Sequence, residues 1–322
     1  MNCSKLRVLR ALRQGFLWGL ASALVLAAAP LEAATILQYS FNETGNTAAS
    51  TGTNTTAVTM RNDAGTATDL HGPAGSGVTG ITADRAFANL SPNTHGSAAS
   101  AATNGFRADQ ADLNAIDQLQ SFTLSGWFKT ETAEALAGKT PRLFWNHNDS
   151  SAGFNLQFFS GSEDLKLDVD DNSTFVNTAG NQYADKQAWV FFAVTYDGTV
   201  TSNNIKFYKG YRTDAEAKLG TTQTTAQTKL ISTHTLNRGT VGTETIGLVL
   251  GNRTAGDRPF DGYLDEMRID GGSGASNALT LAQIEAIRVT AVNLPEPSSF
   301  VLASVAGALV VGYRWRKRAD RR

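Results

Sequence analysis

The sequence contains very little cysteine. Its 322 residues include a single cysteine, Cys3, in a segment that we expect to be removed. The mature chain would then have no disulfide bond, no zinc site built from thiolates and no cysteine nucleophile. We therefore expect its stability to come from a packed core or from a bound metal ion.

Charged residues are also scarce, at 18% of the chain, whereas hydrophobic residues make up 41%. That apolar fraction is enough for a core, so a chain that is disordered throughout is excluded. Basic side chains are concentrated at the two ends, which leaves the middle of the chain acidic. A nucleic-acid binder needs a basic folded surface, and we predict no nucleic-acid partner.

The common catalytic motifs are missing as well. The chain has no Gly-x-Ser-x-Gly, no His-Glu-x-x-His, no phosphate-binding loop and no EF-hand pattern, and its four histidines are scattered. Glycoside hydrolysis needs two facing carboxylates. The neighbours Asp265 and Glu266 should instead point to opposite faces of a strand. We predict that the protein is not an enzyme and has no catalytic residues.

An export signal is present at the N-terminus. Residues 1–33 begin with basic side chains up to Arg13 and continue with an apolar run over 16–29. Pro30 ends this run, and Ala33 supplies a small residue at the expected cleavage position. We predict a signal peptide over 1–33, removed by signal peptidase so that the mature chain begins at Ala34. The alternative is a membrane anchor that is never cleaved.

The C-terminus has three parts in a characteristic order. A linker over 291–299 contains the tripeptide Pro295, Glu296 and Pro297. An apolar run over 300–313 follows as a transmembrane anchor, although a full span needs about 20 residues. A basic tail over 314–322 would stay cytoplasmic; its membrane-flanking residues are Arg314, Arg316, Lys317 and Arg318.

This order resembles the PEP-CTERM sorting signal of bacterial proteins that are processed by exosortases. The resemblance implies an exosortase-type enzyme as a partner. It also implies a protein that is exported to the cell envelope or the extracellular space. The C-terminal helix would hold it in the inner membrane, transiently or permanently.

The middle of the chain reads as short strands separated by turn residues, which predicts an all-β antiparallel sandwich. Residues 42–104 are rich in Thr, Ala, Asn, Gly and Ser and should be loop-rich, with short strands near Val58 and over 81–87. One short C-terminal helix should be capped by Thr280, with Gln283 three residues on. The other expected strands cover 35–41, 122–128, 142–145, 154–159, 165–169, 189–196, 205–208, 246–250 and 262–269.

Two tryptophans lie in runs that carry large residues on both faces. Trp127 is within 122–128 and Trp189 begins 189–196. A strand that is apolar on both faces is usually central in a sheet, covered on both sides. We therefore place both tryptophans in the core rather than in a ligand site.

Three segments, 122–128, 188–210 and 260–270, are similar to strands of LamG-like (concanavalin A-like) domains. The resemblance implies a jelly-roll sandwich over 34–290 that acts as an exported binding module for carbohydrate, such as a polysaccharide, or for extracellular-matrix material. A structural envelope or biofilm protein without a specific ligand is the alternative. A glycoside hydrolase of the same fold is the third interpretation.

The resemblance also implies Ca²⁺ as a cofactor, with Asp265 as a metal ligand at the acidic position of the closing strand. A buried structural hydrogen bond would explain Asp265 equally well. The acids Asp168, Asp170 and Asp171 form a second cluster, which we interpret as a solvated turn. For sugar binding we expect exposed aromatic rings at a rim, with Trp145 and Tyr211 as candidates, although core packing explains Trp145 equally well.

The sorting tail gives a first testable prediction. Deleting residues 295–322 removes the tripeptide, the apolar run and the basic cluster together, so the protein should move from the envelope fraction to the periplasm or the medium. Cell fractionation with immunoblotting measures this. Unchanged fractionation would argue against a sorting role.

Overall fold

The computed structural model describes residues 33–90, 105–111, 114–130, 140–147, 152–159, 162–170, 175–184, 187–220, 223–272 and 277–292. The signal peptide up to residue 32, the Pro295–Glu296–Pro297 motif, the anchor and the basic tail all lie outside these residues. Within the described part of the chain, none of the helices has the length and apolar character needed to cross a membrane.

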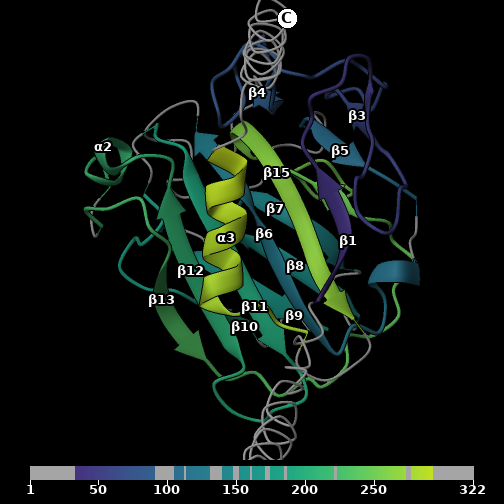
Figure 1. Cartoon of the computed structure of the whole chain (residues 1–322). Helices are drawn as coiled ribbons and strands as arrows, with labels where there is room; N and C mark the ends of the chain where they lie inside the picture. Colours follow the sequence, from purple (N-terminus) through teal and green to yellow (C-terminus); the bar gives the residue numbers. More distant parts are fainter. Residues whose placement is uncertain are drawn as a thin grey trace, which may run out of the picture. The chain divides into compact units, whose positions relative to one another are not determined.

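One antiparallel sheet contains seven strands in the order β1-β15-β6-β11-β12-β13, with β4 paired to β15 (Figure 1). Its strands are β1 (Ala34–Tyr39), β4 (Phe87–Leu90), β6 (Ser121–Thr130), β11 (Val190–Asp197), β12 (Ile205–Tyr211), β13 (Lys229–His234) and β15 (Asp261–Gly272).

The other sheet has eight strands in the order β10-β9-β8-β7-β14-β5-β3-β2 and lies behind the first in Figure 1. The two sheets confirm the predicted all-β antiparallel sandwich. The strands of the second sheet are β2 (Thr47–Ala48), β3 (Val58–Arg61), β5 (Arg107–Asp109), β7 (Arg142–His147), β8 (Gly153–Phe158), β9 (Leu165–Val169), β10 (Phe175–Asn177) and β14 (Val249–Leu250).

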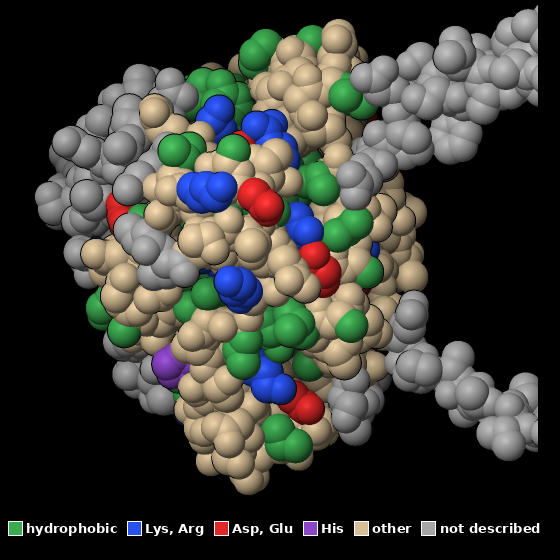
Figure 2. Space-filling model, turned by 60° about the vertical axis from the view of Figure 1, so that its left-hand side comes forward, with side chains coloured by type: hydrophobic (Ala, Val, Ile, Leu, Met, Phe, Trp, Pro, Cys, Tyr) green, Lys and Arg blue, Asp and Glu red, His purple; other side chains and the backbone are tan. Residues whose placement is uncertain are grey.

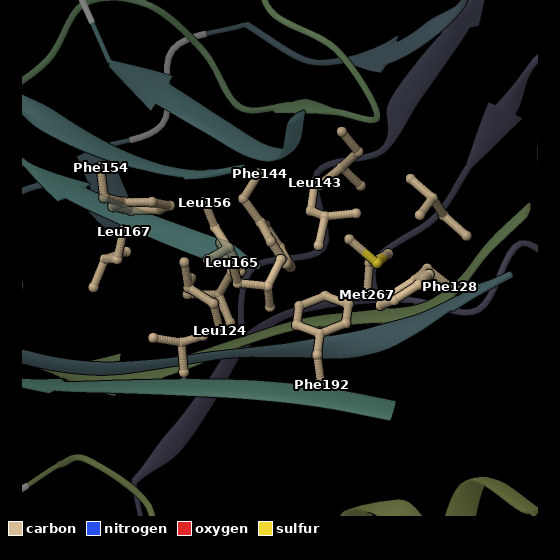
Figure 3. Packing of buried hydrophobic residues seen from close by; sticks show 14 of the residues in the cluster. Leu124, Phe128, Leu143, Phe144, Phe154, Leu156, Leu165, Leu167, Phe192 and Met267 are labelled. Carbon is tan, nitrogen blue, oxygen red and sulfur yellow. The ribbon is translucent and has the colours of Figure 1, made fainter. Parts of the chain in front are cut away.

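The main core fills the space between the two sheets. Figure 3 shows Phe144, Leu156 and Leu167 of the eight-stranded sheet facing Leu124 and Phe192 of the seven-stranded sheet. Each of these side chains is at most 1% exposed. Alternation along each strand sends every second side chain inward, so the intervening residues of the eight-stranded sheet must lie on its outer face.

A second apolar cluster lies on the outer face of the seven-stranded sheet. Helix α3 (Leu281–Val292) covers that face in Figure 1 and packs Ile284 against Trp127 and Trp189. The backbone N–H of Gln283 donates to Thr280 Oγ1 at 3.4 Å, which confirms the predicted cap. Strands β6 and β11 are neighbours and are covered on both faces, so the expected burial of both tryptophans is confirmed.

Two short helical segments complete the described chain, the 3-10 helix η1 (Asn114–Ile116) and α2 (Asp214–Ala217). Figure 2 brings the side with α2, β12 and β13 forward. Basic and acidic side chains are interspersed there. Beside α2, Arg212 forms an ion pair with Glu216 at 2.7 Å, and within α3 Arg288 forms one with Glu285 at 2.7 Å. The described part of this view has no continuous patch of one charge sign.

Most strand predictions hold to within a few residues, and two need correction. The strand expected over 81–87 is wrong, because β4 begins only at Phe87 and the preceding residues form turns. Of the strand expected over 246–250, only Val249 and Leu250 pair. Strands β2, β5, β10 and β13 were not predicted, because they are either very short or lack a regular apolar face.

The packing under α3 predicts a large stability effect at Trp127, whose side chain is fully buried. Trp127→Ala should lower the free energy of unfolding by about 3–5 kcal/mol, since it leaves a large cavity between β6 and α3. Leu281→Ala is the matched control, because Leu281 at the start of α3 is 43% exposed. Chemical denaturation measures both variants, and equal midpoints for the two would contradict this assignment of the outer cluster.

Candidate functional site

The outer face of the eight-stranded sheet carries a continuous group of polar side chains across β7, β8 and β9. They alternate with the core residues of the same strands, as Asn155 does between Phe154 and Leu156. We call this group the polar sheet face; its members are Arg142, Trp145, His147, Asn155, Gln157, Lys166 and Asp168.

Strand register arranges these side chains in two rows. Trp145 lies opposite Asn155, which lies opposite Asp168, so one row crosses three strands. In the second row, Gln157 lies between Arg142 and Lys166. Neighbours within such rows have Cβ atoms about 4.5–5.5 Å apart. The sheet therefore places an aromatic ring, two amides and charged groups within reach of one small ligand.

The side chains of the polar sheet face also contact one another. The Arg142 guanidinium lies 5.2 Å from the centroid of the Trp145 ring, a cation–π contact. The Asn155 Nδ2 donates to Asp168 Oδ2 at 2.7 Å and to Gln157 Oε1 at 2.8 Å. Lys166 Nζ is 3.0 Å from Asp168 Oδ1. These contacts fix the orientation of the two amides.

Among the buried polar atoms of the polar sheet face that have no hydrogen-bond partner are the Trp145 Nε1 donor and the Asn155 Oδ1 acceptor. Trp145 is 2% exposed and Asn155 is fully buried. Because an unsatisfied buried polar atom costs about 1–3 kcal/mol, such atoms are rare and usually have a ligand or a water as partner. A donor and an acceptor on cross-strand neighbours match a group that both accepts and donates.

Asp168 is the one carboxylate among the outward-facing described residues of β7, β8 and β9. Burial raises the pKa of Asp168 above its usual value, whereas the Lys166 charge and the hydrogen bonds from Lys166 and Asn155 act in the opposite direction. Beyond β14, Asp109 continues the polar surface with ion pairs to Arg61 at 2.7 Å and to Arg107 at 2.8 Å.

A family model described as the concanavalin A-like lectin/glucanases superfamily matches residues 101–284, more than half of the chain. This chain belongs to that superfamily. The match includes the strands β6, β7, β8, β9, β11 and β15 that build the core and the polar sheet face. A search of curated protein sequences gives no match.

Solved structures similar to this superfamily member have low sequence identity. Domain 4 of the extracellular arabinanase AbnA from Geobacillus stearothermophilus, in complex with arabinotriose, is 17% identical with a TM-score of 0.48, covering 80% of this chain and 99% of that one. The binding domain of botulinum neurotoxin serotype D is 13% identical with a TM-score of 0.48. The match covers 80% of this chain and 50% of that one. The binding domain of Paraclostridial Mosquitocidal Protein 1 is 12% identical with a TM-score of 0.48. The match covers 79% of this chain and 52% of that one. This chain thus spans about half the length of the two toxin domains.

The aromatic candidates from the sequence are not exposed. Trp145 is on the polar sheet face, but its ring is 2% exposed rather than projecting at a rim. Tyr211 is fully buried between the sheets, beside Lys209, whose Nζ lies 5.6 Å from the centroid of the Tyr211 ring. Burial lowers the pKa of Lys209 to about 8. The expected exposure of both rings is wrong, because Tyr211 packs in the main core and the Trp145 ring contacts Arg142 and His147.

The remaining site candidates lie far apart in the topology. Asp168 is buried on the polar sheet face, so its interpretation as part of a solvated turn is wrong. Asp170 accepts the Gly242 N–H at 2.7 Å, and Asp171 lies outside the described residues. Asp265 is on the seven-stranded sheet, away from this face.

Sequence reasoning missed Asn155 and Gln157, although their strict alternation with Phe154, Leu156 and Phe158 was a usable signal.

A β-bulge brings Asp265 and Glu266 to the same face. Asp265 faces Trp127 and Arg268 faces Ser125, so β15 has one extra residue there, and Glu266 adopts a φ of 49°. Leu264 and Met267 both point into the core, which leaves the two acids between them on the outer side. The expectation that the two carboxylates point to opposite faces is therefore wrong.

Asp265 is fully buried and accepts two backbone N–H groups, from Val78 at 2.8 Å and from Glu266 at 2.8 Å. Burial raises the pKa of Asp265 well above its usual value, and the charges of Glu266 and Asp84 raise it further. Such oxygens suit a hard cation. The described residues, however, include no group of three or more His, Cys, Asp or Glu side chains arranged to hold a metal ion. Calcium at Asp265 stays a prediction.

Calcium at Asp265 is tested by thermal melting with calcium and with chelator. Calcium at a thousandfold excess over its dissociation constant should add about 4 kcal/mol to the free energy of unfolding. Asp265→Asn should remove this response. Asp270→Asn, on the same strand and paired with Arg268 at 2.7 Å, is the matched control and should keep it. A melting temperature indifferent to chelator would refute calcium binding and leave Asp265 a structural hydrogen-bond acceptor.

Proposed function

We propose that this chain is a carbohydrate-binding module whose ligand is held by the polar sheet face. The observation that carries the proposal is the pair of buried, unpartnered atoms, Trp145 Nε1 and Asn155 Oδ1, on adjacent strands. A sugar hydroxyl accepts one hydrogen bond and donates another, so one hydroxyl or a vicinal pair satisfies both atoms.

The rest of the polar sheet face fits the same ligand class. The Trp145 ring offers an apolar surface for the C–H face of a pyranose or furanose, and Gln157, Arg142 and Lys166 offer further hydrogen bonds nearby. Because Trp145 keeps only 2% of its surface exposed, a ligand must displace neighbouring chain to reach Nε1. The cost of this displacement lowers the apparent affinity.

The contacts of the Asp168 carboxylate favour sugar binding over sugar hydrolysis. Its two oxygens are engaged by Asn155 and Lys166, at 2.7 Å and 3.0 Å. Glycoside hydrolysis needs a second carboxyl about 5–9.5 Å away, across the scissile bond. The same incubation with glycan, assayed for new reducing ends, tests the hydrolase alternative directly.

We also propose that the module works at the cell envelope. The supports are the predicted export signal over 1–33 and the predicted tripartite C-terminal segment with Pro295, Glu296 and Pro297, both inferred from the sequence. An exosortase-type enzyme and signal peptidase would process the chain. An envelope protein without a specific ligand remains the alternative, and it predicts no binding in the next experiment.

Sugar binding is tested on the full-length chain, first on a glycan array and then by calorimetry with the best oligosaccharide. Trp145→Phe keeps an aromatic ring but removes the Nε1 donor, so it should weaken binding about 5–10-fold, the value of one hydrogen bond. Trp189→Phe, on the outer face of the other sheet, is the matched control and should bind like the unaltered chain. Absence of glycan binding, or equal affinities for both variants, would refute the proposal.

A further inference from the structure

A second cluster of titratable side chains lies near β4, in the segment before it. His71 forms an isolated bridge with Phe87, and its imidazole is 1% exposed. Two carboxylates flank the ring, Asp69 on one side and Glu43 on the other. Backbone N–H groups hold both acids, from Gly45 to Asp69 Oδ2 at 3.2 Å and from Ala49 to Glu43 Oε1 at 3.1 Å.

Asp69 determines which ring nitrogen of His71 carries the proton. Its Oδ1 lies 2.8 Å from His71 Nδ1 and also accepts the His71 backbone N–H at 3.1 Å. Because a carboxylate oxygen accepts, Nδ1 is the ring nitrogen that donates to Asp69, and Nε2 is the one left to bind a further group.

The Nε2 atom of His71 faces Glu43 Oε2 at 4.0 Å, and both atoms are buried without a hydrogen-bond partner. This separation exceeds a direct hydrogen bond, which needs about 2.7–3.2 Å. A tetrahedral zinc ion with bonds of about 2.1 Å holds two ligand atoms about 3.4 Å apart. A small rotation of the Glu43 side chain, which is 38% exposed, closes the difference.

We infer that His71 Nε2 and Glu43 Oε2 are the protein ligands of a divalent first-row transition metal, with Zn²⁺ as its representative. Asp69 does not bind the metal but orients the imidazole; a carboxylate, a backbone carbonyl or a water does this for most metal-binding histidines. A nitrogen ligand selects zinc, copper or nickel over calcium and magnesium, which prefer oxygen. Water or a ligand atom completes the coordination.

The test is a Zn²⁺ titration of the metal-free full-length chain by calorimetry. The unaltered chain should bind Zn²⁺ at this site. His71→Gln should abolish that binding, Glu43→Gln should weaken it at least tenfold, and Asp69→Asn should weaken it about 10–100-fold. His234→Gln is the matched control, because His234 contacts Ser232 rather than a carboxylate, and it should bind Zn²⁺ like the unaltered chain.

A visible absorption spectrum with Co²⁺ gives a second readout that does not depend on stability. Its absorption bands should be present in the unaltered chain and in His234→Gln and absent in His71→Gln. Glu43→Gln retains an oxygen for the Ala49 N–H and should keep the melting temperature of the metal-free chain. If Zn²⁺ does not bind, or binds equally to His71→Gln and Glu43→Gln, the cluster is an ion-pair array alone and the inference is overturned.

Discussion

The antiparallel pairing of β6 with both β11 and β15 is the constraint on which the rest of the structure depends. Along β6, Phe122, Leu124 and Phe128 point into the space between the sheets, whereas Trp127 points outward under α3. The same strand therefore anchors the main core and the second apolar cluster. Because the mature chain is expected to lack disulfide bonds, apolar burial on both faces of this central strand is the main source of its stability.

This arrangement makes the two sheets chemically different. The outer face of the seven-stranded sheet is covered by α3, and its strands β6 and β11 carry apolar side chains on both sides. The inward residues of β7, β8 and β9 complete the main core, and the outward residues of the same strands are polar. Those outward side chains are nevertheless buried, with Trp145 2% exposed and Asn155 and Asp168 fully buried. Strand register then fixes the neighbours of Trp145 and Asn155, and this geometry supports a binding site there.

The sequence allowed the longer strands rich in apolar residues to be predicted, including β6, β8, β9 and β11, as well as the cap of α3. It did not allow the bulge at Glu266 to be predicted, because the extra residue is set by packing across strands. A Cβ at Gly126 would lie 2.6 Å from Met267 Sδ, so that contact depends on both partners. The burial of Trp145 and Tyr211 likewise depends on distant segments. The Glu43–Asp69–His71 cluster left no spacing signal, because Glu43 is remote in sequence from the other two.

The most direct test of the binding site is the indole N–H region of a ¹⁵N NMR spectrum during titration with an oligosaccharide. The chain has five tryptophans, of which Trp127, Trp145 and Trp189 lie in the described sandwich. Binding at the polar sheet face should shift the Trp145 Nε1–H resonance, because this donor gains an acceptor, and should leave Trp127 and Trp189 unchanged. A shift of Trp127 or Trp189 with Trp145 unmoved would contradict the account.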